Sequence, residues 1–405
     1  MSGRDPRVGT SAQALTSASV PRAADRRRSV CLFTDSMEPS GVGEHMLGLA
    51  RELRAELDLS FVCPPTAAGG RLLERAAALG LRVLPLEARG NGAAQARLGA
   101  WLRLAGVDIF HAHAGIGWEG HHGVRAARAA GVPVVIRTEH LPNVMTDPAQ
   151  QRTYTAMSRL VDRTICVSGG VARSYAAVGV PRSGLRVVHN GVASPEPRAG
   201  ARRGRALGLP RGSRLLLSVG RLTAQKGHAD LIRALPLVLQ AAPDVHLAIA
   251  GSGALEAELR TLTRSLGLDG RVRLLGQRDD VPDLMLAAAL VVLPSRFEGL
   301  PLAALEAMAL GRAVIGTRVC GMSEAVKDRV TGRLVPVGRP GALGAAIVDA
   351  LEDDAMRASW ESAARARFTE RFTAARMAAQ IARVYREFAE LRARSAEPLT
   401  TRRTA

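Results

Sequence analysis

Apolar residues gather in short runs that are separated by longer amphipathic stretches over most of the chain. A first series of runs occupies residues 30–33, 59–63, 81–86, 107–111, 132–137, 163–167 and 185–189. A second series occupies residues 215–219, 245–250, 272–275, 290–293, 313–316 and 332–335. Continuous apolar runs of this length are typical of strands covered on both faces. Because helical patterns rich in Ala and Arg lie between them, we expect parallel sheets with helices on both sides.

The two series predict two domains of the doubly wound α/β class. The stretch 198–212, rich in Arg and Gly, predicts a linker between an N-terminal domain at 29–197 and a C-terminal domain at 213–370. A last helix is expected at 371–392, and the polar segments 1–28 and 393–405 are expected to be disordered tails. Two such domains would face a ligand cleft at the carboxyl ends of their strands.

The net charge of the chain favours anionic partners. It amounts to +18 over 405 residues. The first 28 residues carry +4 and the stretch from Arg392 carries +3, which leaves about +11 on the body. The basic residues are dispersed and no aromatic platform accompanies them, so we expect no nucleic-acid partner. A phosphate-bearing substrate or an anionic membrane surface fits this charge better.

Several features favour a cytoplasmic location. No apolar run approaches the ~18 residues that span a bilayer, and the N-terminus lacks a secretory pattern. The cysteines lie far apart and form no C-x-x-C pair, which favours a reducing compartment: Cys31, Cys63, Cys166 and Cys320. Neither a G-x-S-x-G elbow nor a P-loop is present, which excludes the enzymes that depend on those motifs.

Two glutamates eight residues apart are the strongest chemical signal. Glu298 follows the apolar run 290–293, and Glu306 lies more than a turn into a helix that Pro301 can start. A helix N-terminus offers free N–H groups to anions, while Gly299 lets a ligand approach the backbone of residues 299 and Leu300. Carboxylates beside such a site suit sugar and ribose hydroxyls, so this segment predicts a nucleotide-sugar site.

Two cations occupy the corresponding position at the start of the second domain. Arg221 lies just past the run 215–219, and Lys226 lies close to the N-terminus of the next helix. Apart from Lys327, Lys226 is the only lysine in an Arg-rich chain. Either residue alone would be ordinary loop charge. Together, upstream of the two glutamates, they predict a clamp for a diphosphate.

Three further loops follow predicted strands and could approach a nucleotide. Glycine pairs are found in two of them, and a Gln–Arg pair is found in the third: Gly41 and Gly43, Gly251 and Gly253, and Gln277 and Arg278. A lone G-x-G is a weak signal, and its expected role is backbone shape with one or two amide contacts. Asp279 and Asp280 are expected to cap a helix that has Pro282 just inside it.

Histidines cluster in the first domain. His111 and His113 lie at alternate positions of a predicted strand, so their side chains share one side of the sheet, and His121 and His122 follow. No carboxylate or cysteine spacing completes a metal site, so we expect no metal. His140 follows another strand at the inner side of the cleft, where it could reach a donor sugar.

These motifs resemble the retaining GT-B glycosyltransferases of family 4. The resemblance covers about residues 29–388 and is most specific in the second domain. It is carried by Val219-Gly220-Arg221, Lys226-Gly227, Ala250-Gly251-Ser252-Gly253, the Glu298–Glu306 segment and Gly311-Arg312-Ala313-Val314-Ile315. The family's G-G-x-P-E segment reads Cys320-Gly321-Met322-Ser323-Glu324 here, without the first glycine and the proline.

The resemblance implies transfer from a nucleoside-diphosphate sugar with retention and without a catalytic metal or other cofactor. Arg221 and Lys226 would stabilise the diphosphate, and Glu298 with the Gly299 and Leu300 amides would hold the sugar. Glu306 would bind the ribose. It also implies that His140 lies by the sugar, that the 41–43 loop lies near the phosphates, and that the last helices cross back to the first domain.

The resemblance leaves the substrates and some alternatives open. It implies a donor of UDP or GDP type and an acceptor that offers a hydroxyl group. The expected acceptor is a glycolipid, an oligosaccharide or a small metabolite, and the expected process is the synthesis of bacterial envelope polysaccharides or glycolipids, or the glycosylation of small metabolites. The basic charge favours peripheral contact with the inner face of an anionic membrane. The alternatives are a sugar-nucleotide epimerase or phosphorylase on the same fold, and a non-enzymatic binder of anionic ligands.

Overall fold

Two parallel β-sheets contain the apolar runs of the two predicted domains. The computed structural model describes residues 26–87, 91–196 and 207–396. Residues 1–25 and 397–405 of the predicted tails and 198–206 of the predicted linker therefore lie outside the described residues. The first sheet contains β1 (Ser29–Phe33), β2 (Asp58–Cys63), β3 (Arg82–Pro85), β4 (Ile109–Ala114), β5 (Val134–Glu139), β6 (Arg163–Cys166) and β7 (Leu185–Val187). The second contains β8 (Arg214–Val219), β9 (Val245–Ala250), β10 (Val272–Leu274), β11 (Leu290–Leu293), β12 (Val314–Thr317) and β13 (Gly332–Val335).

Both sheets have the strand order of a doubly wound fold. The order is β3-β2-β1-β4-β5-β6-β7 in the first and β10-β9-β8-β11-β12-β13 in the second, and the paired strands are parallel. The order reverses between β1 and β4 and again between β8 and β11. Loops diverge at such switch points and leave a crevice at the carboxyl ends of the strands, where ligands bind.

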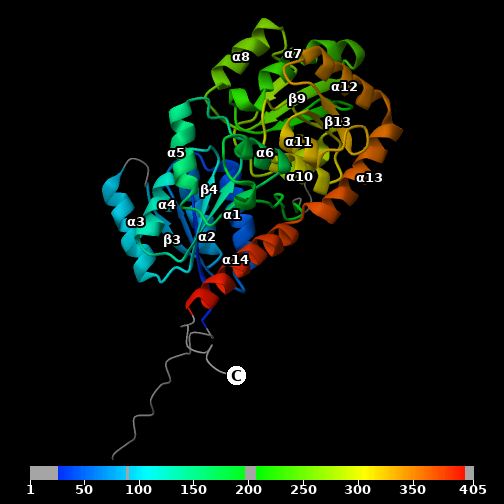
Figure 1. Cartoon of the computed structure of the whole chain (residues 1–405). Helices are drawn as coiled ribbons and strands as arrows, with labels where there is room; N and C mark the ends of the chain where they lie inside the picture. Colours follow the sequence, from blue (N-terminus) through cyan, green and yellow to red (C-terminus); the bar gives the residue numbers. More distant parts are fainter. Residues whose placement is uncertain (1–25, 88–90, 197–206, 397–405) are drawn as a thin grey trace, which may run out of the picture.

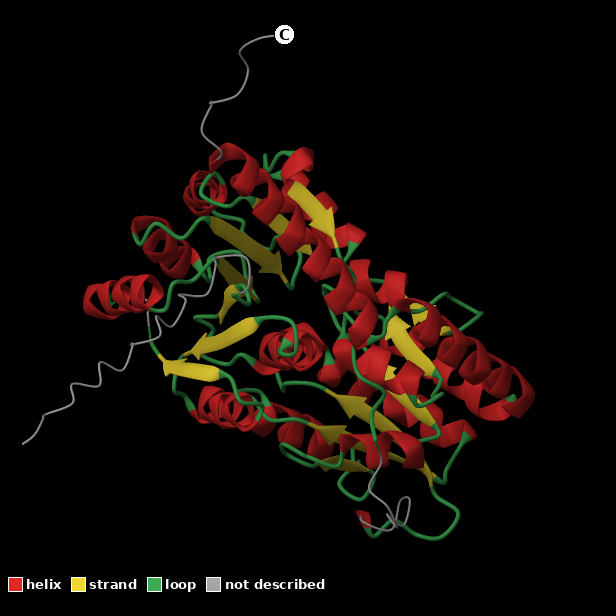
Figure 2. Ribbon diagram, turned by 90° about the horizontal axis from the view of Figure 1, so that it is seen from below, coloured by secondary structure: helices red, strands yellow, loops and turns green. Residues whose placement is uncertain are grey.

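Helices cover both faces of each sheet, as Figure 2 shows. The first domain has α1 (Ser40–Leu53), α2 (Ala67–Ala78), α3 (Gly92–Leu104), α4 (His121–Ala129), α5 (Pro148–Ser158) and α6 (Gly169–Ala177). The second has α7 (His228–Ala241), α8 (Glu256–Ser265), α9 (Val281–Ala287), α10 (Leu302–Ala309), α11 (Cys320–Ala325) and α12 (Pro340–Glu352). Short 3₁₀ turns lie at Arg182–Gly184 and Ala224–Lys226. This cover explains why inner strands such as β1 and β11 are apolar on both faces.

The last two helices join the domains. Helix α13 (Asp354–Arg371) packs on α10, and α14 (Ala374–Ala396) runs back along the first domain against α1 (Figure 1). Met377, Ile381 and Tyr385 of α14 are buried in the core of the first domain. The expected crossing of the C-terminal helices is therefore confirmed, as is the GT-B architecture of two Rossmann-like domains.

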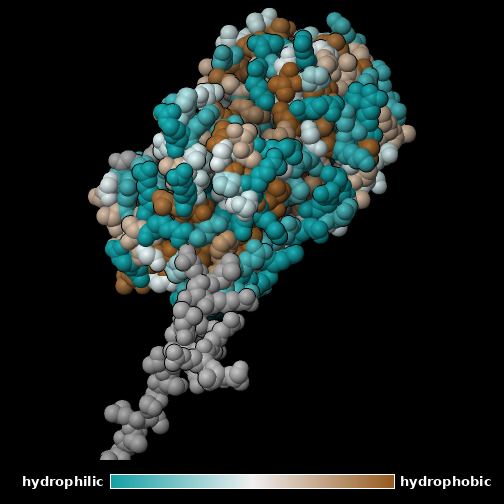
Figure 3. All heavy atoms as spheres, viewed as in Figure 1, coloured by the Kyte–Doolittle hydropathy of each residue, from teal (hydrophilic) through white to brown (hydrophobic). Residues whose placement is uncertain are grey.

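The visible surface, the helices and the cysteines have no specialised feature among the described residues. Figure 3 shows hydrophilic and hydrophobic residues interspersed over the visible face. None of the helices in the described part of the chain combines the length and the apolarity that crossing a bilayer requires. The four cysteines are unpaired, and burial raises the pKa of Cys31 to about 12, so this thiol stays protonated and unreactive.

Candidate functional site

A cleft of about 280 Å³ lies between the two domains at both switch points. Its walls come from the loops after β1 and β4 in the first domain and after β8 and β11 in the second, together with the first turns of α1 and α10. Five of the residues predicted from sequence as catalytic or ribose-binding line it: His140, Arg221, Lys226, Glu298 and Glu306. The carboxyl ends of the parallel strands bring them together although they are distant in sequence.

Lys226 and Glu298 form an ion pair inside the cleft. Lys226 Nζ lies 2.6 Å from Glu298 Oε1, and the same oxygen accepts a hydrogen bond of 2.7 Å from Ser295 Oγ. Glu298 is 5% exposed and Lys226 20%. The turn at Lys226 depends on Gly227, which adopts φ +67° and leaves no room for a Cβ beside the Pro294 carbonyl. This geometry holds an ammonium and a carboxylate side by side at the cleft wall.

Arg221 faces the first domain across the cleft. Its Nη1 lies 3.7 Å from Glu38 Oε2, and its Nη2 donates to Gln225 Oε1 at 3.3 Å. Gln225 Nε2 in turn donates to the carbonyl of Phe297. The guanidinium is therefore held by one amide and one distant, exposed carboxylate, and a guanidinium is well suited to bind a diphosphate in their place.

Helix α10 brings its N-terminus and the second glutamate to the cleft. The helix begins after Pro301, and Leu300, Pro301 and Leu302 line the cleft. Burial and the negative charge of Glu44 raise the pKa of Glu306 to about 7. Unpaired N–H groups at a helix N-terminus attract phosphate, while a carboxyl group with this pKa can donate or accept hydrogen bonds with hydroxyls. The N-terminus of α1 also opens on the cleft through Ser40 and Gly41.

His140 enters the cleft from the end of β5. Its side chain is 8% exposed, and its Nε2 lies 3.3 Å from His113 Nδ1. Burial, together with the nearby His45 and His111, lowers the pKa of His140 well below the usual value. The imidazole is therefore neutral near pH 7, and it can exchange hydrogen bonds with a sugar without carrying charge.

Six residues predicted as donor-binding do not line the cleft: Gly43, Gly251, Gly253, Gln277, Arg278 and Gly299. A Cβ at Gly299 would collide with the His140 carbonyl, and one at Gly251 would collide with the Gly220 carbonyl. Both glycines thus permit close backbone contact beside the cleft. Their contact with the donor stays a prediction.

The Gln–Arg pair after β10 has other partners in the structure. Gln277 accepts a hydrogen bond of 2.9 Å from Arg71 of the first domain. Arg278 forms two hydrogen bonds with Asp280, of 2.8 and 2.6 Å. Asp280 precedes α9 as the expected cap residue, but its carboxylate faces Arg278 and does not cap the helix. A role of this pair in binding a base also stays a prediction.

Three residues at the cleft or the domain interface have contacts that the sequence did not predict. Glu38 and Asn190 line the cleft, and Glu324 joins the domains by accepting hydrogen bonds from the Gly169 and Gly170 amides, at 2.8 and 2.7 Å. Asn190 follows an apolar run directly, which is a signal that could have identified it. Glu38 and Glu324 contact the other domain. Glu324 ends the segment that corresponds to the G-G-x-P-E motif, but that resemblance assigned it no partner.

The fold and the cleft define the class of the molecule, a GT-B protein with a cleft between two Rossmann-like domains. The sequence profile of "Glycosyl transferases group 1" matches residues 203–367, and that of "Glycosyltransferase Family 4" matches residues 39–194. The chain is 30% identical to the D-inositol 3-phosphate glycosyltransferase of Thermobispora bispora over 312 residues, 70% of this chain and 71% of the other. The chain belongs to family 4 of the group 1 glycosyltransferases.

Two further comparisons agree with this membership. The D-inositol 3-phosphate glycosyltransferase of Nocardiopsis dassonvillei is 33% identical over 281 residues, and the match spans 64% of this chain and 65% of that one, less than two thirds of either. The crystal structure of HepE from Anabaena in complex with UDP and glucose has a TM-score of 0.78 at 22% identity, and covers 89% of this chain and 100% of HepE. At 22% identity, the similarity to HepE shows a shared fold and no more.

Proposed function

We propose that this chain is a retaining glycosyltransferase that moves a hexosyl group from a UDP- or GDP-type sugar to a hydroxyl acceptor, without a catalytic metal. The observation that carries the proposal is the set of charges around one cleft. Arg221, Lys226 and two helix N-termini surround the space beside Glu298 and Glu306. Cations and amides suit a diphosphate, and the carboxyl groups suit hydroxyls. The HepE complex with UDP and glucose supports a donor of this class.

The proposed reaction is an exchange of one bond at the anomeric carbon. The bond from that carbon to the diphosphate oxygen breaks, the acceptor oxygen bonds to the same face, and the acceptor proton moves to the departing phosphate. Negative charge grows on the diphosphate during this step. Arg221 and Lys226 would therefore contribute most in the transition state, because fixed charges act most strongly where charge develops.

The remaining polar groups would orient the donor. Glu306 would bind the ribose hydroxyls, and Glu298 would accept hydrogen bonds from the sugar while Lys226 and Ser295 hold it in place. The neutral His140 would contact the sugar from the first domain. Closure of the two domains over the donor would exclude water and limit hydrolysis.

For the acceptor we propose a glycolipid, an oligosaccharide or a small metabolite, used in the cytoplasm at the inner face of the membrane. The related enzymes named for D-inositol 3-phosphate support a small phosphorylated acceptor. The charge of +18 supports an anionic surface or an anionic acceptor. Sedimentation with vesicles that contain anionic lipid would show the membrane contact, and equal sedimentation with neutral vesicles would exclude it.

The first test is release of nucleoside diphosphate from UDP-, GDP-, ADP- and TDP-hexoses with D-inositol 3-phosphate, an oligosaccharide or a glycolipid as acceptor. Removing a key electrostatic donor costs about 100-fold or more in turnover, so Lys226→Ala and Arg221→Ala should each lower release by at least that factor. Lys327→Ala, at the only other lysine, and Arg264→Ala are matched controls, because both lie outside the cleft.

Product analysis separates the alternatives. Near-wild-type turnover in Lys226→Ala would overturn the assignment of the clamp. A changed sugar nucleotide without any acceptor would indicate an epimerase, and release of a sugar phosphate with inorganic phosphate would indicate a phosphorylase. Inversion at the anomeric carbon of the product would contradict the retaining mechanism.

A further inference from the structure

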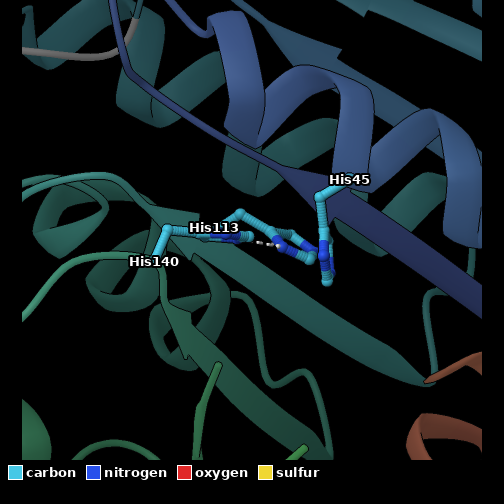
Figure 4. Close-up of side chains that lie close together, drawn as sticks. All are labelled: His45, His113 and His140. Carbon is cyan, nitrogen blue, oxygen red and sulfur yellow. Dashed lines mark hydrogen bonds between the residues drawn. The ribbon is translucent and has the colours of Figure 1, made fainter. Parts of the chain in front are cut away.

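Three buried histidines meet behind the first-domain wall of the cleft. His45 comes from α1, His113 from β4, and His140 from the residue after β5 (Figure 4). They are 3%, 0% and 8% exposed. One ring nitrogen from each lies within 4.8 Å of the others. Three imidazoles from separate elements thus converge on one point of the core.

Asn190 fixes the state of the first histidine. The Asn190 Nδ2 group donates to the Leu300 carbonyl at 2.8 Å, so its Oδ1 faces His45 Nδ1 at 3.0 Å as an acceptor. His45 Nδ1 must therefore carry the proton, and Nε2 carries a lone pair. That Nε2 is buried and has no hydrogen-bond partner among the described residues. A buried lone pair without a donor is costly unless something binds it.

Of the other two rings, His113 also has a nitrogen that is unsatisfied among the described residues, whereas His140 contacts His113. His113 Nδ1 and His140 Nε2 are 3.3 Å apart, and His113 Nε2 is also buried without a partner in the described part of the chain. Two nitrogen ligands at ~2.05 Å from a tetrahedral zinc ion are about 3.3 Å apart. Burial lowers the pKa of His45 to about 4, so the ring is neutral near pH 7, as a metal ligand must be.

A fourth histidine provides an internal contrast. His111 lies beside His113, but its Nδ1 is 2.6 Å from the Tyr385 hydroxyl and its Nε2 is 2.7 Å from Thr138 Oγ1. Both nitrogens are thus hydrogen-bonded, and His111 has no ligand atom to offer. Within this cluster of described residues, the unsatisfied nitrogens are His45 Nε2 and His113 Nε2.

We propose that His45, His113 and His140 bind one divalent transition-metal ion, with Zn²⁺ as the reference ion. Imidazole nitrogens suit Zn²⁺, Ni²⁺ and Cu²⁺, and three histidines with a fourth position left for water are an established zinc arrangement. Asn190 serves as the outer partner that orients His45. The nearby charge of Arg137 is neutralised by its ion pair with Glu139.

The site is separate from the proposed diphosphate clamp but shares His140 with the donor pocket. A bound ion would hold the His140 ring against His45 and His113 and withdraw it from the sugar. If the proposed function is correct, stoichiometric Zn²⁺ therefore inhibits transfer. Because metal binding is measured directly on the protein, it can succeed or fail independently of any transferase activity.

The test is titration of the tag-free full chain with Zn²⁺ against a competing chelator, after dialysis to remove metals. We expect one equivalent per chain. Loss of an outer hydrogen-bond partner lowers metal affinity by about 10- to 100-fold, so Asn190→Ala should weaken binding by that factor. His45→Asn and His113→Asn should weaken it further. His246→Asn is the matched control, because His246 is a buried histidine of the second domain.

Two results would overturn the site. One is absence of saturable Zn²⁺ binding to the wild-type chain, and the other is equal affinity in the wild type, His45→Asn and His113→Asn. Circular dichroism establishes that each variant is folded. If the two histidine variants do not fold, the comparison between Asn190→Ala and His246→Asn decides the question, since equal affinity in these two would also contradict the proposal.

Discussion

The ion pair of Lys226 and Glu298 fits the proposed role of both residues in ligand binding better than a role in stability. A buried pair gains little over apolar residues, because both charges lose water. Here Ser295 adds a second hydrogen bond to the same carboxylate oxygen. The arrangement holds a cation at the cleft wall, where the proposed diphosphate would compete with Glu298 for it.

Removing one partner of this pair should destabilise the fold. Loss of one partner from a fully buried pair costs about 3–5 kcal/mol. Because Lys226 is 20% exposed, we expect Lys226→Met to lower the free energy of unfolding by about 2–3 kcal/mol. Adding Glu298→Gln should restore part of the loss, since no unpaired charge remains. Urea denaturation measures both, and strictly additive losses would contradict the coupling.

The raised pKa of Glu306 gives a pH dependence of stability. Its folded-state pKa is about 7 against an ordinary value of 4.5, so the folded chain holds a proton that the unfolded chain loses between these values. The stabilisation of the folded state by this proton is complete below pH 4.5 and is lost as the pH rises through 7. Glu306→Gln should therefore stabilise the chain at pH 8 by roughly 1–3 kcal/mol relative to wild type.

Thermal melts of wild type and Glu306→Gln at pH 5, 6, 7 and 8 measure this effect. The difference in melting temperature should grow from pH 5 to pH 7 and then remain constant. Glu352→Gln, at an exposed position of α12, is the control and should show no such trend. A constant difference between the Glu306 variant and wild type over the whole range would show that the carboxyl group titrates normally.

At the level of elements, the segment from β11 to α10 places the site. Gly299 passes so close to the His140 carbonyl that a Cβ would collide with it. We expect Gly299→Ala to force the two domains apart and to lower transfer by at least about 10-fold, because misplacement by an ångström costs that much or more. Secondary structure should be unchanged.

Circular dichroism and a transfer assay, run together, check this expectation. The matched control is Gly341→Ala, at the exposed first turn of α12, where a Cβ meets nothing within 4 Å. That variant should keep full transfer. Wild-type transfer in Gly299→Ala would mean that the domain contact at this glycine is dispensable.

The elements themselves could be predicted from the sequence to a large extent. Apolar runs mark the positions of the strands, most clearly for inner strands such as β1 and β11, which are buried on both faces. The edge strands β3 and β7 are largely exposed. The position of Asp280 before α9 was also predictable, but its pairing with Arg278 was not. A side chain can pair with any of several nearby polar groups, and the spacing of residues along the sequence does not show which of them it will bind.

At the scale of the whole molecule, most of the side-chain contacts that the sequence did not predict lie at the interface between the two domains. The meeting of Arg221, Lys226, Glu298 and His140 at one cleft was predictable, because each lies in a segment that follows a strand and parallel order brings strand ends together. Glu306 joins them from α10, the helix after β11. The contacts of Glu38 and Glu324 were not predictable, because their partners lie in the other domain. The three-histidine cluster was likewise hidden, since His45 belongs to a helix distant in sequence from His113 and His140.

Glu324 should hold the two domains together. It accepts hydrogen bonds from two amides at the start of α6 and lies 3.1 Å from His189 Nε2. Burial opposes ionisation, but these hydrogen bonds lower the pKa of its carboxyl group overall. Charge-assisted hydrogen bonds contribute about 1.5–3 kcal/mol each. We therefore expect Glu324→Ala to lower the melting temperature by several degrees and to raise the radius of gyration in small-angle scattering.

The exposed Glu352→Ala serves as its control and should change neither quantity. If Glu324→Ala keeps the wild-type radius and melting temperature, the hydrogen bonds to α6 do not hold the domains together. A lower melting temperature with an unchanged radius would place the effect in local stability.

The most direct test of the central claim is a thermal-shift panel of UDP, GDP, ADP and TDP with their hexose conjugates, run on wild type and Glu306→Ala. A ligand at 100 times its Kd stabilises the folded state by about 2.7 kcal/mol. We predict that one nucleotide class raises the melting temperature by several degrees and that Glu306→Ala loses this rise. No stabilisation by any nucleotide, or equal stabilisation of the variant, would contradict a nucleotide-sugar site in this cleft.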